Sequence, residues 1–398
     1  MKVIGIVCEY DPFHRGHAHH LARTREAAGE DACIVCCMSG DFVQRGAFAS
    51  FPKAIRAEAA VRGGADLVVE LPIPWAVASA PRFAAGAVSV LGALGCDAIS
   101  FGAQAGDAAA LSRGAEQLCS PVFDEALREA LSTGMSFASA RAEAAVRAGV
   151  LPALLEDPNA NLGLEYLRAA REQGLCLDPL VIPRQGAGHD APADGGPLLS
   201  ASAIREALRR DREDLSALPE QTAPLFAGAV SRGLGPVFTE EQALPRMAAL
   251  RRMSPEDLAA LPDMSEGFEH RLWEAVRDSV TPEEAADRAK TKRFAHARIR
   301  RQLLLAYLGF TSADGEGLPP YANILAFNHR GRAHLSRYAG ALPLVNKPGR
   351  RELSPAGERL FRKEAVAADL YALALPDPAA RAGGSAYRFS PVYVQDAE

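Results

Sequence analysis

The sequence predicts an α/β protein built on a doubly wound parallel sheet, with a mainly helical C-terminal domain. Short apolar runs alternate with helix-like patterns through the first hundred residues. The runs are apolar throughout, which is typical of parallel strands buried on both faces. Strand signals fade after about residue 215, and helical patterns dominate to about residue 310. In such a sheet, ligands bind beyond the carboxyl ends of the strands.

The predicted elements follow one another in a regular order. Apolar runs predict strands over residues 3–8, 32–38, 67–71 and 98–101. Helices are predicted between them, because each segment is followed by glycine, over residues 16–28, 52–62 and 81–94. Later in the chain we expect a strand over 180–183, a helix that opens at Ser200, and a last strand within 386–394. Connections between the parallel strands should be right-handed crossovers.

Length and composition limit the classes of protein. A chain of 398 residues suggests two or three domains, and we place a boundary between 1–215 and 216–398. With 48% hydrophobic residues, 23% charged residues and a net charge of -5, the chain is neither disordered nor a uniformly basic nucleic-acid coat. Any contact with nucleic acid therefore needs a local basic patch.

The expected location is the cytoplasm. The most apolar stretch, residues 83–96, is shorter than the ~18–20 residues that span a bilayer, and no signal peptide precedes the first strand, so no membrane contact is expected. The seven cysteines are odd in number and lie mostly in apolar runs, which favours reduced, buried thiols. Cys33 and Cys36 form a C-x-x-C inside a predicted strand, where core packing is the favoured role.

The strongest chemical signal follows the first predicted strand, in the run His14-Arg15-Gly16-His17. Backbone N–H groups and the helix dipole favour an anion at this point. Gly16 leaves room for a phosphate, and two imidazoles can donate to its oxygens as charge builds there. Two alternatives stay open: exposed loop histidines, or a metal on His14, His17 and His20. The metal alternative has no carboxylate or cysteine at an obvious companion position, so we predict no metal site.

A second signal is the run Ser200-Ala201-Ser202-Ala203-Ile204-Arg205, which alone would be a helix cap. It follows, in the right order, an Asp-Pro-Phe and a His-x-Gly-His motif. The pair resembles the nucleotidyltransferase superfamily, in which both signatures meet the phosphates of a nucleoside triphosphate. The resemblance implies a nucleotidyltransferase-like (HUP) fold and the catalytic residues His14, His17 and Arg205.

Further motifs narrow the resemblance. They lie at residues 38–46, 66–72, 101–102, 158–159, 162–166, 184–190, 265–267, 290–294 and 327–328. Together they look like the tRNA(Met) cytidine acetate ligase family. The resemblance implies that ATP and acetate form acetyl-adenylate and pyrophosphate, and that acetyl then passes to N4 of the wobble cytidine in elongator tRNA(Met). It also implies an ATP-binding domain over 1–215 and a tRNA-binding helical domain over 216–398.

In that family ATP is held by the loop after the first strand and by later residues. Carried over to this sequence, the ATP-binding residues are Val7, Cys8, Glu9, Tyr10, Asp11, Pro12, Phe13, His14, Arg15, Gly16, His17, His20, Gly102, Asn159, Arg184 and Ser202. Two departures stand out. Gly188 directly precedes His189, where the family has an aromatic residue, and Asn159-Ala160-Asn161 replaces the usual polar pair. We therefore predict Asn159 as the ATP-contacting asparagine, with Asn161 as the alternative.

A carboxylate that attacks a triphosphate meets like charge, so the site must neutralise the phosphates and hold the reactants in line. His14, His17, Arg205 and Arg184 suit this role, with Mg²⁺ as an expected helper. No nucleophilic side chain is needed, because the mixed anhydride already activates the acetyl group. Glu9 and Asp11 could orient the ribose, the histidines or a metal.

Polar residues after the second predicted strand should face the same crevice. These are Ser39, Asp41 and Arg45. Lys53 and Arg56 follow on the next helix, where either the crevice or a solvated helix face would account for them.

Residues 288–301 contain seven Lys or Arg and no acid, a local reversal in an acidic chain. We predict that this segment contacts RNA phosphates, with an exposed helix paired to acids elsewhere as the alternative. The anticodon loop is single-stranded, so its bases can be read in a pocket. Two other functions stay open. One is a small-molecule nucleotidyltransferase that makes a dinucleotide-type cofactor, and the other is a non-catalytic RNA-binding protein.

Overall fold

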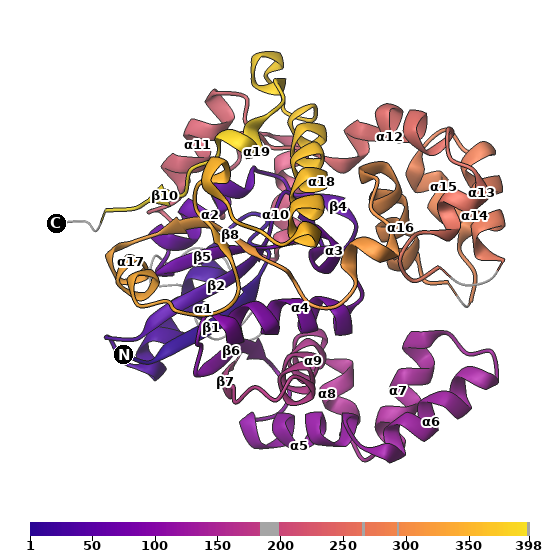
Figure 1. Cartoon of the computed structure of the whole chain (residues 1–398), viewed down its shortest axis with the longest axis horizontal. Helices are drawn as coiled ribbons and strands as arrows, with labels where there is room; N and C mark the ends of the chain where they lie inside the picture. Colours follow the sequence, from indigo (N-terminus) through magenta and orange to yellow (C-terminus); the bar gives the residue numbers. More distant parts are fainter. Residues whose placement is uncertain (184–198, 265–266, 293, 396–398) are drawn as a thin grey trace.

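The computed structural model describes residues 1–183, 199–264, 267–292 and 294–395. A large sheet crosses the molecule (Figure 1), with strands in the order β10-β8-β5-β2-β1-β6-β7 and with β9 beside β8. The strands are β1 Val3–Cys8, β2 Cys33–Ser39, β5 Leu67–Leu71, β6 Ala98–Ala103, β7 Asp178–Pro183, β8 Ala322–Phe327, β9 Leu344–Val345 and β10 Val392–Tyr393. Strands β5, β2, β1, β6 and β7 are mutually parallel, which confirms the predicted sheet. Strand β8 runs antiparallel to β5.

The helices of the first half are α1 Arg15–Ala28, α2 Lys53–Arg62, α3 Ile73–Ala76, α4 Ala80–Ala93, α5 Ala108–Leu118, α6 Pro121–Ser132, α7 Phe137–Arg147, α8 Pro152–Glu156, α9 Pro158–Glu172 and α10 Ala201–Arg210. Those of the second half are α11 Ala223–Ser231, α12 Ala243–Leu250, α13 Pro255–Ala259, α14 Phe268–Arg277, α15 Pro282–Ala289, α16 His296–Leu308, α17 His329–Ser336, α18 Pro355–Ala372 and α19 Ser385–Arg388. A small antiparallel hairpin, β3 Phe42–Val43 and β4 Ala47–Phe48, follows β2.

The sheet is apolar on both faces because helices cover both. All seven residues of β2 are buried. On one face Ile34 packs in a cluster with Leu21 of α1 and Ile55 of α2. On the other, Val35 belongs to a cluster with residues of α4 and α9, including Leu164. The doubly wound arrangement therefore follows from strands that are apolar at nearly every position.

The cysteines agree with the prediction in part. All seven are free thiols, and Cys8, Cys33, Cys36, Cys37 and Cys96 are buried. The C-x-x-C motif lies inside β2 and packs in the core, as predicted. Cys119 and Cys176 are exposed, which corrects the expectation of buried thiols at those two positions. Both follow the end of a helix, where their side chains face solvent.

The C-terminal region is mainly helical, but it also completes the sheet. Strands β8 and β10 come from residues 322–327 and 392–393, and β8 pairs directly with β5 of the first half. The late strand expected within 386–394 is thus β10. The boundary near residue 215 stays a prediction. Among the described helices, none is both long and apolar enough to cross a lipid bilayer.

Candidate functional site

The loop after β1 places two histidine rings face to face at the start of α1. His14 is the residue that caps the helix, and its Nδ1 accepts a hydrogen bond from the Gly16 N–H at 3.1 Å. The N–H of His14 in turn donates to Nδ1 of His17 at 3.3 Å. The ring centroids are 3.6 Å apart, with 21° between the planes. Because each Nδ1 is an acceptor, the neutral rings carry their proton on Nε2.

These contacts bear on the alternatives for the histidines. His14 is only 7% exposed, so the alternative of an exposed loop histidine is wrong for this residue. The Nε2 of His20 is 3.1 Å from Oγ of Ser100 on β6. A stacked pair with both Nδ1 atoms bound to backbone N–H groups differs from the convergent ligands of a zinc site.

Gly16 has a structural role that the sequence did not reveal. A Cβ built at this position would lie 3.0 Å from Cε1 and 3.1 Å from Nδ1 of His14. That is tighter than ordinary van der Waals contact, so a side chain here would require the His14 ring to shift by a few tenths of an ångström. Glycine therefore preserves the stacked pair itself, in addition to the room for a phosphate that the motif suggests.

The second signature reaches the same loop. Ser200 caps α10, and Arg205 on that helix donates from Nη1 to the carbonyl oxygen of Asp11 at 2.6 Å, across a separation of 194 residues. The same nitrogen is 3.6 Å from the Asp11 carboxylate, and Nη2 donates to Oγ of Ser202 at 3.3 Å. The arginine side chain keeps 24% of its surface exposed. The two signatures are thus brought together, with the guanidinium at the edge of the histidine loop.

The loop after β6 is tied to the start of α9 by Asp157. Its Oδ2 accepts from the N–H groups of Gln104 and Ala105 at 2.7 and 3.1 Å, and its Oδ1 accepts from the N–H of Asn159 at 2.9 Å. Burial alone would raise the pKa of Asp157, but these backbone N–H groups hold it below its ordinary value. The arrangement keeps Gly102 on β6 and Asn159 on α9 in neighbouring segments at the carboxyl edge of the sheet.

The geometry separates the two candidate asparagines. Oδ1 of Asn161 accepts from Arg141 at 3.1 Å, and its Nδ2 donates to the Leu155 carbonyl at 3.4 Å. Within the described part of the chain, the Asn159 side chain makes no such bond. The structural contacts thus occupy Asn161, which supports Asn159 as the residue available to a ligand.

The remaining predicted residues differ in where their side chains lie. Tyr10 and Phe13 are buried, and the Tyr10 ring packs against both Phe13 and His17. These two rings therefore pack against the histidine loop on its buried side. Arg15 donates to the Ser216 carbonyl at 2.8 Å. Val7 and Cys8 end β1, Pro12 is buried in the loop, and Ser202 is exposed. Arg184 lies outside the described residues, as do Gly188, His189 and Arg293.

The sequence names Arg56 as a candidate for the crevice but does not reveal its partners. Its side chain is fully buried, and its hydrogen bonds within the described residues go to backbone carbonyls. The guanidinium donates to Phe51 at 2.8 Å, to Ser39 at 3.2 Å, and to Glu9 and Gly40. It thereby joins the loop after β1 to the loop after β2. The alternative of a solvated helix face is wrong for Arg56, because α2 packs this side onto the carboxyl ends of the strands.

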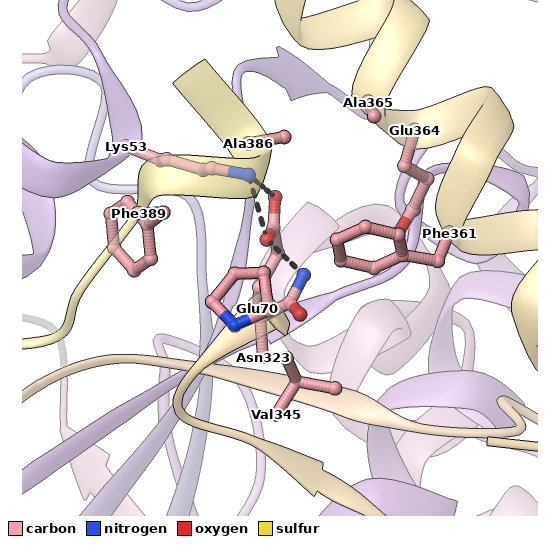
Figure 2. Close-up of a pocket in the computed structure, with 10 residues that line it drawn as sticks. Lys53, Glu70, Asn323, Val345, Phe361, Glu364, Ala365, Ala386 and Phe389 are labelled. Carbon is pink, nitrogen blue, oxygen red and sulfur yellow. Dashed lines mark hydrogen bonds and ion pairs between the residues drawn. The ribbon is translucent and has the colours of Figure 1, made fainter. Parts of the chain in front are cut away.

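Lys53 is also turned inward, into a buried polar cluster (Figure 2). Its Nζ lies 2.7 and 2.8 Å from the two carboxylate oxygens of Glu70, and Asn323 donates to one of these oxygens at 2.8 Å. Asp41, expected in the crevice, is buried and accepts from the Lys53 N–H at 2.8 Å. Lys53, Glu70 and Asn323 line a cavity of about 20 Å³, enough for one water molecule.

Glu364 of α18 faces the same cavity. It accepts hydrogen bonds from the Ile73 N–H at 2.6 Å and from the Tyr321 hydroxyl. Burial raises the pKa of Glu364 to about 7, the nearby Glu70 adds to this, and the Tyr321 and Ile73 bonds and Lys53 oppose it. When the pKa of a carboxyl is higher in the folded protein than in the unfolded chain, its contribution to stability is fully present at low pH, where the group is protonated in both. That contribution is lost as pH rises from the pKa of the unfolded chain through that of the folded protein.

We therefore expect Glu364→Gln to change how stability depends on pH. Between about pH 5 and pH 8 the free energy of unfolding of the wild type should fall relative to the variant, by about 2–3 kcal/mol, because the glutamine does not ionise. Urea unfolding at several pH values measures this difference. The exposed Glu352→Gln is the matched control. Parallel pH curves for Glu364→Gln and the wild type would contradict the expectation.

The basic segment 288–301 is not one uniform face. Arg288 pairs with Glu284 at 2.9 Å, Arg298 donates to the Asp263 carbonyl, and burial lowers the pKa of Arg301. Lys290, Lys292 and Arg300 are exposed. The alternative of an exposed helix paired to acids is therefore met at Arg288, while three cations face solvent.

The β3–β4 hairpin approaches this segment. Gly46 has a φ of +76°, and a Cβ there would lie 2.6 Å from the carbonyl carbon of Arg300, so only glycine allows this contact. Arg45, beside it, is exposed. We call the exposed side chains of Arg45, Lys290, Lys292 and Arg300 the basic surface. The close approach at Gly46 places Arg45 beside the start of α16.

A doubly wound sheet with a stacked histidine pair at the end of β1, and an arginine that reaches it from a later helix, defines an α/β nucleotidyltransferase. The family described as HIGH Nucleotidyl Transferase matches residues 1–385. A tRNA(Met) cytidine acetate ligase of Acetivibrio thermocellus is 34% identical, over 97% of this chain and 98% of that protein. A tRNA(Met) cytidine acetate ligase of Syntrophotalea carbinolica is 38% identical, over 88% of this chain and 86% of that protein.

Two solved structures of a related protein have the same fold as this chain. Thermotoga maritima TmcAL bound with alpha-thio ATP has a TM-score of 0.90 at 30% identity, and its apo form has a TM-score of 0.91 at 31% identity. Each comparison covers 100% of both chains. The chain belongs to the tRNA(Met) cytidine acetate ligase family, as its motifs predicted.

Proposed function

We propose that this protein is an ATP-dependent ligase that acetylates N4 of the wobble cytidine in elongator tRNA(Met). Acetate attacks the α-phosphorus of ATP, pyrophosphate leaves, and the acetyl group of the acetyl-adenylate then passes to the cytidine. One observation carries the proposal: Arg205 contacts the Asp11 carbonyl in the loop that stacks His14 on His17. A polyanion at the carboxyl edge of the sheet would meet two Nε2–H donors and a guanidinium there.

The chemistry follows from charge. Attack of a carboxylate on a triphosphate brings negative groups together, so donors must be fixed before the reaction rather than recruited during it. The capping contacts at Nδ1 hold both histidine rings in place. We assign His14, His17 and Arg205 to the phosphates and Asn159 to the nucleotide.

Magnesium is the expected companion of the triphosphate. The described residues contain no group of three or more side chains suited to hold a metal by themselves. Mg²⁺ commonly needs only one or two carboxylates, with phosphates and waters as its other ligands. Asp11 has two oxygens at the loop, one bound to Ser50 and one near Arg205. A magnesium ion would therefore rely chiefly on the ATP phosphates, where it neutralises charge.

The tRNA requires a basic contact, and the basic surface supplies it in this proposal. It lies on the hairpin and on the segment before and within α16, beside the loop after β2. The proposed place of action is the cytoplasm, which accords with the seven free thiols of the described chain.

Neutralising part of the basic surface should weaken tRNA binding. For Lys290→Gln, Lys292→Gln and Arg300→Gln combined, we expect the slope of log affinity against log salt to become shallower by about 0.7–0.9 for each phosphate that is no longer neutralised. Titrations at several salt concentrations measure the slope. The control removes three exposed arginines elsewhere, Arg113, Arg359 and Arg362. An unchanged slope in the test variant would remove these residues from the RNA interface.

The proposed activity is tested by incubating the protein with ATP, labelled acetate and total tRNA, followed by nucleoside analysis. Labelled N4-acetylcytidine that requires ATP supports the proposal. Pyrophosphate release that depends on a phosphorylated cofactor precursor, with no labelled tRNA, would indicate a small-molecule nucleotidyltransferase instead. Binding of tRNA without any turnover would indicate a non-catalytic RNA-binding protein.

A further inference from the structure

Glu9 lies at the meeting point of two parts of the proposed site. It directly follows β1 and opens the histidine loop. One of its carboxylate oxygens accepts from the N–H of Gln44 at 2.6 Å, and Gln44 belongs to the β3–β4 hairpin. The other end of that hairpin turn, Gly46, packs on the backbone of Arg300. The carboxylate is therefore fixed between the loop proposed to hold the nucleotide and the hairpin of the basic surface.

The neighbouring carboxylates are already committed to partners. Asp11 accepts from the N–H and the hydroxyl of Ser50 and lies near Arg205. Asp41 and Glu70 are both engaged by Lys53. Among hydrogen bonds within the described residues, Glu9 uses only one oxygen, Oε1. Its second oxygen is left to accept a proton or a hydrogen bond from a ligand.

We propose that Glu9 accepts the proton that the cytidine N4 amine loses during acetyl transfer. This inference rests on the proposed function. The N4 lone pair forms a bond to the acetyl carbon, and the bond from that carbon to the phosphate oxygen breaks. AMP leaves with the electron pair of that bond, while one N4 proton passes to Oε2 of Glu9 and later to water. The products are N4-acetylcytidine, AMP and a proton, so atoms and charge balance.

The surroundings of Glu9 favour the protonated form of its carboxyl more than water does. Burial raises the pKa of Glu9, and Asp11 adds to this effect, while the Gln44 N–H and the cations Arg56 and Arg205 oppose it. Tyr166 of α9 is a further titratable group near Glu9. A carboxylate that binds a proton more readily than usual is a better proton acceptor than an exposed one.

The test variant is Glu9→Gln, because the amide oxygen of glutamine can still accept from the Gln44 N–H. Chemically prepared acetyl-adenylate is mixed with tRNA(Met) and an excess of enzyme, both at saturating concentration, and acetyl transfer is followed over one turnover. We expect the rate at saturation to fall about 100-fold or more. Glu9→Asp should recover part of the loss. Glu26→Gln, an exposed carboxylate on α1, is the matched control.

The pH profile separates a proton acceptor from a structural residue. In the wild type, transfer should speed up with pH until Glu9 is ionised and then level off, and Glu9→Gln should lose this dependence. A variant rate within about threefold of the wild type, or an equal loss at every pH, would overturn the inference. Failure of the wild type itself to acetylate tRNA from acetyl-adenylate would instead overturn the proposed function, so the two failures are distinct.

Discussion

Replacing His17 by alanine should reduce acetyl-adenylate formation by about 10³-fold or more. The His17 ring stacks on the His14 ring, with 3.6 Å between the ring centroids. Because a backbone N–H binds Nδ1 of His17, its Nε2 is a fixed donor. Removal of one such donor to a developing anion costs about 10²–10³ in rate, and loss of the stacked partner would also free the His14 ring. Acetate-dependent exchange of labelled pyrophosphate into ATP measures the step without tRNA.

Two further variants separate the phosphate contact from helix capping. The amide of His17→Asn can take the place of Nδ1 and accept from the His14 N–H, but it cannot reach the position of Nε2. The longer His17→Gln places its amide nearer that position. We expect His17→Asn to fold as the wild type in thermal unfolding yet stay inactive, and His17→Gln to regain part of the activity. Activity of His17→Asn near that of the wild type would contradict the assignment.

Replacing Arg56 by methionine should cost about 3–5 kcal/mol of stability. The side chain is fully buried, and its hydrogen bonds reach four backbone carbonyls on three segments. Methionine fills much of the volume but leaves these carbonyls without a donor, and each buried unsatisfied group costs about 1–3 kcal/mol. Urea unfolding at constant pH gives the difference in free energy.

Arg62→Met is the matched control, since it lies on the same helix α2 and makes an exposed pair with Glu58 at 2.6 Å. Exposed pairs contribute about 0–1 kcal/mol, so this variant should lie within that range of the wild type. Arg56→Lys keeps the charge but offers a single nitrogen, so it should be intermediate. A loss for Arg56→Met no larger than that for Arg62→Met would contradict the role assigned to Arg56.

The central sheet could be predicted because its sequence pattern is local. The runs at β1, β2, β5 and β6 are apolar at nearly every position, a pattern that only strands covered on both faces require. The place of β8 in the sheet could not be predicted. Its partner β5 lies more than 250 residues earlier, as in the Asn323 to Glu70 hydrogen bond, and nothing in its own six residues specifies that partner.

The candidate site likewise contains residues that a local motif reveals and contacts that no local pattern reveals. The sequence singles out His14, Gly16, His17 and Arg205 because two short motifs occur in a known order. The partners of Arg56 could not be predicted, because its acceptors are backbone carbonyls, which leave no mark on the sequence. For the same reason the choice between Asn159 and Asn161 needed coordinates, since only the contacts of Asn161 with Arg141 and Leu155 distinguish two identical side chains.

The antiparallel seam between β5 and β8 also bears on how the chain is made. Ribosomes release the N-terminal strands first, and β5 is buried on both faces but has an open hydrogen-bonding edge until residues 322–327 arrive. While the intervening chain is being translated, the nascent protein carries an unpaired apolar edge. Any peptide in an extended conformation could pair with this edge. This topology therefore leaves an aggregation-prone edge on the nascent chain until β8 is made, independent of what the finished enzyme does.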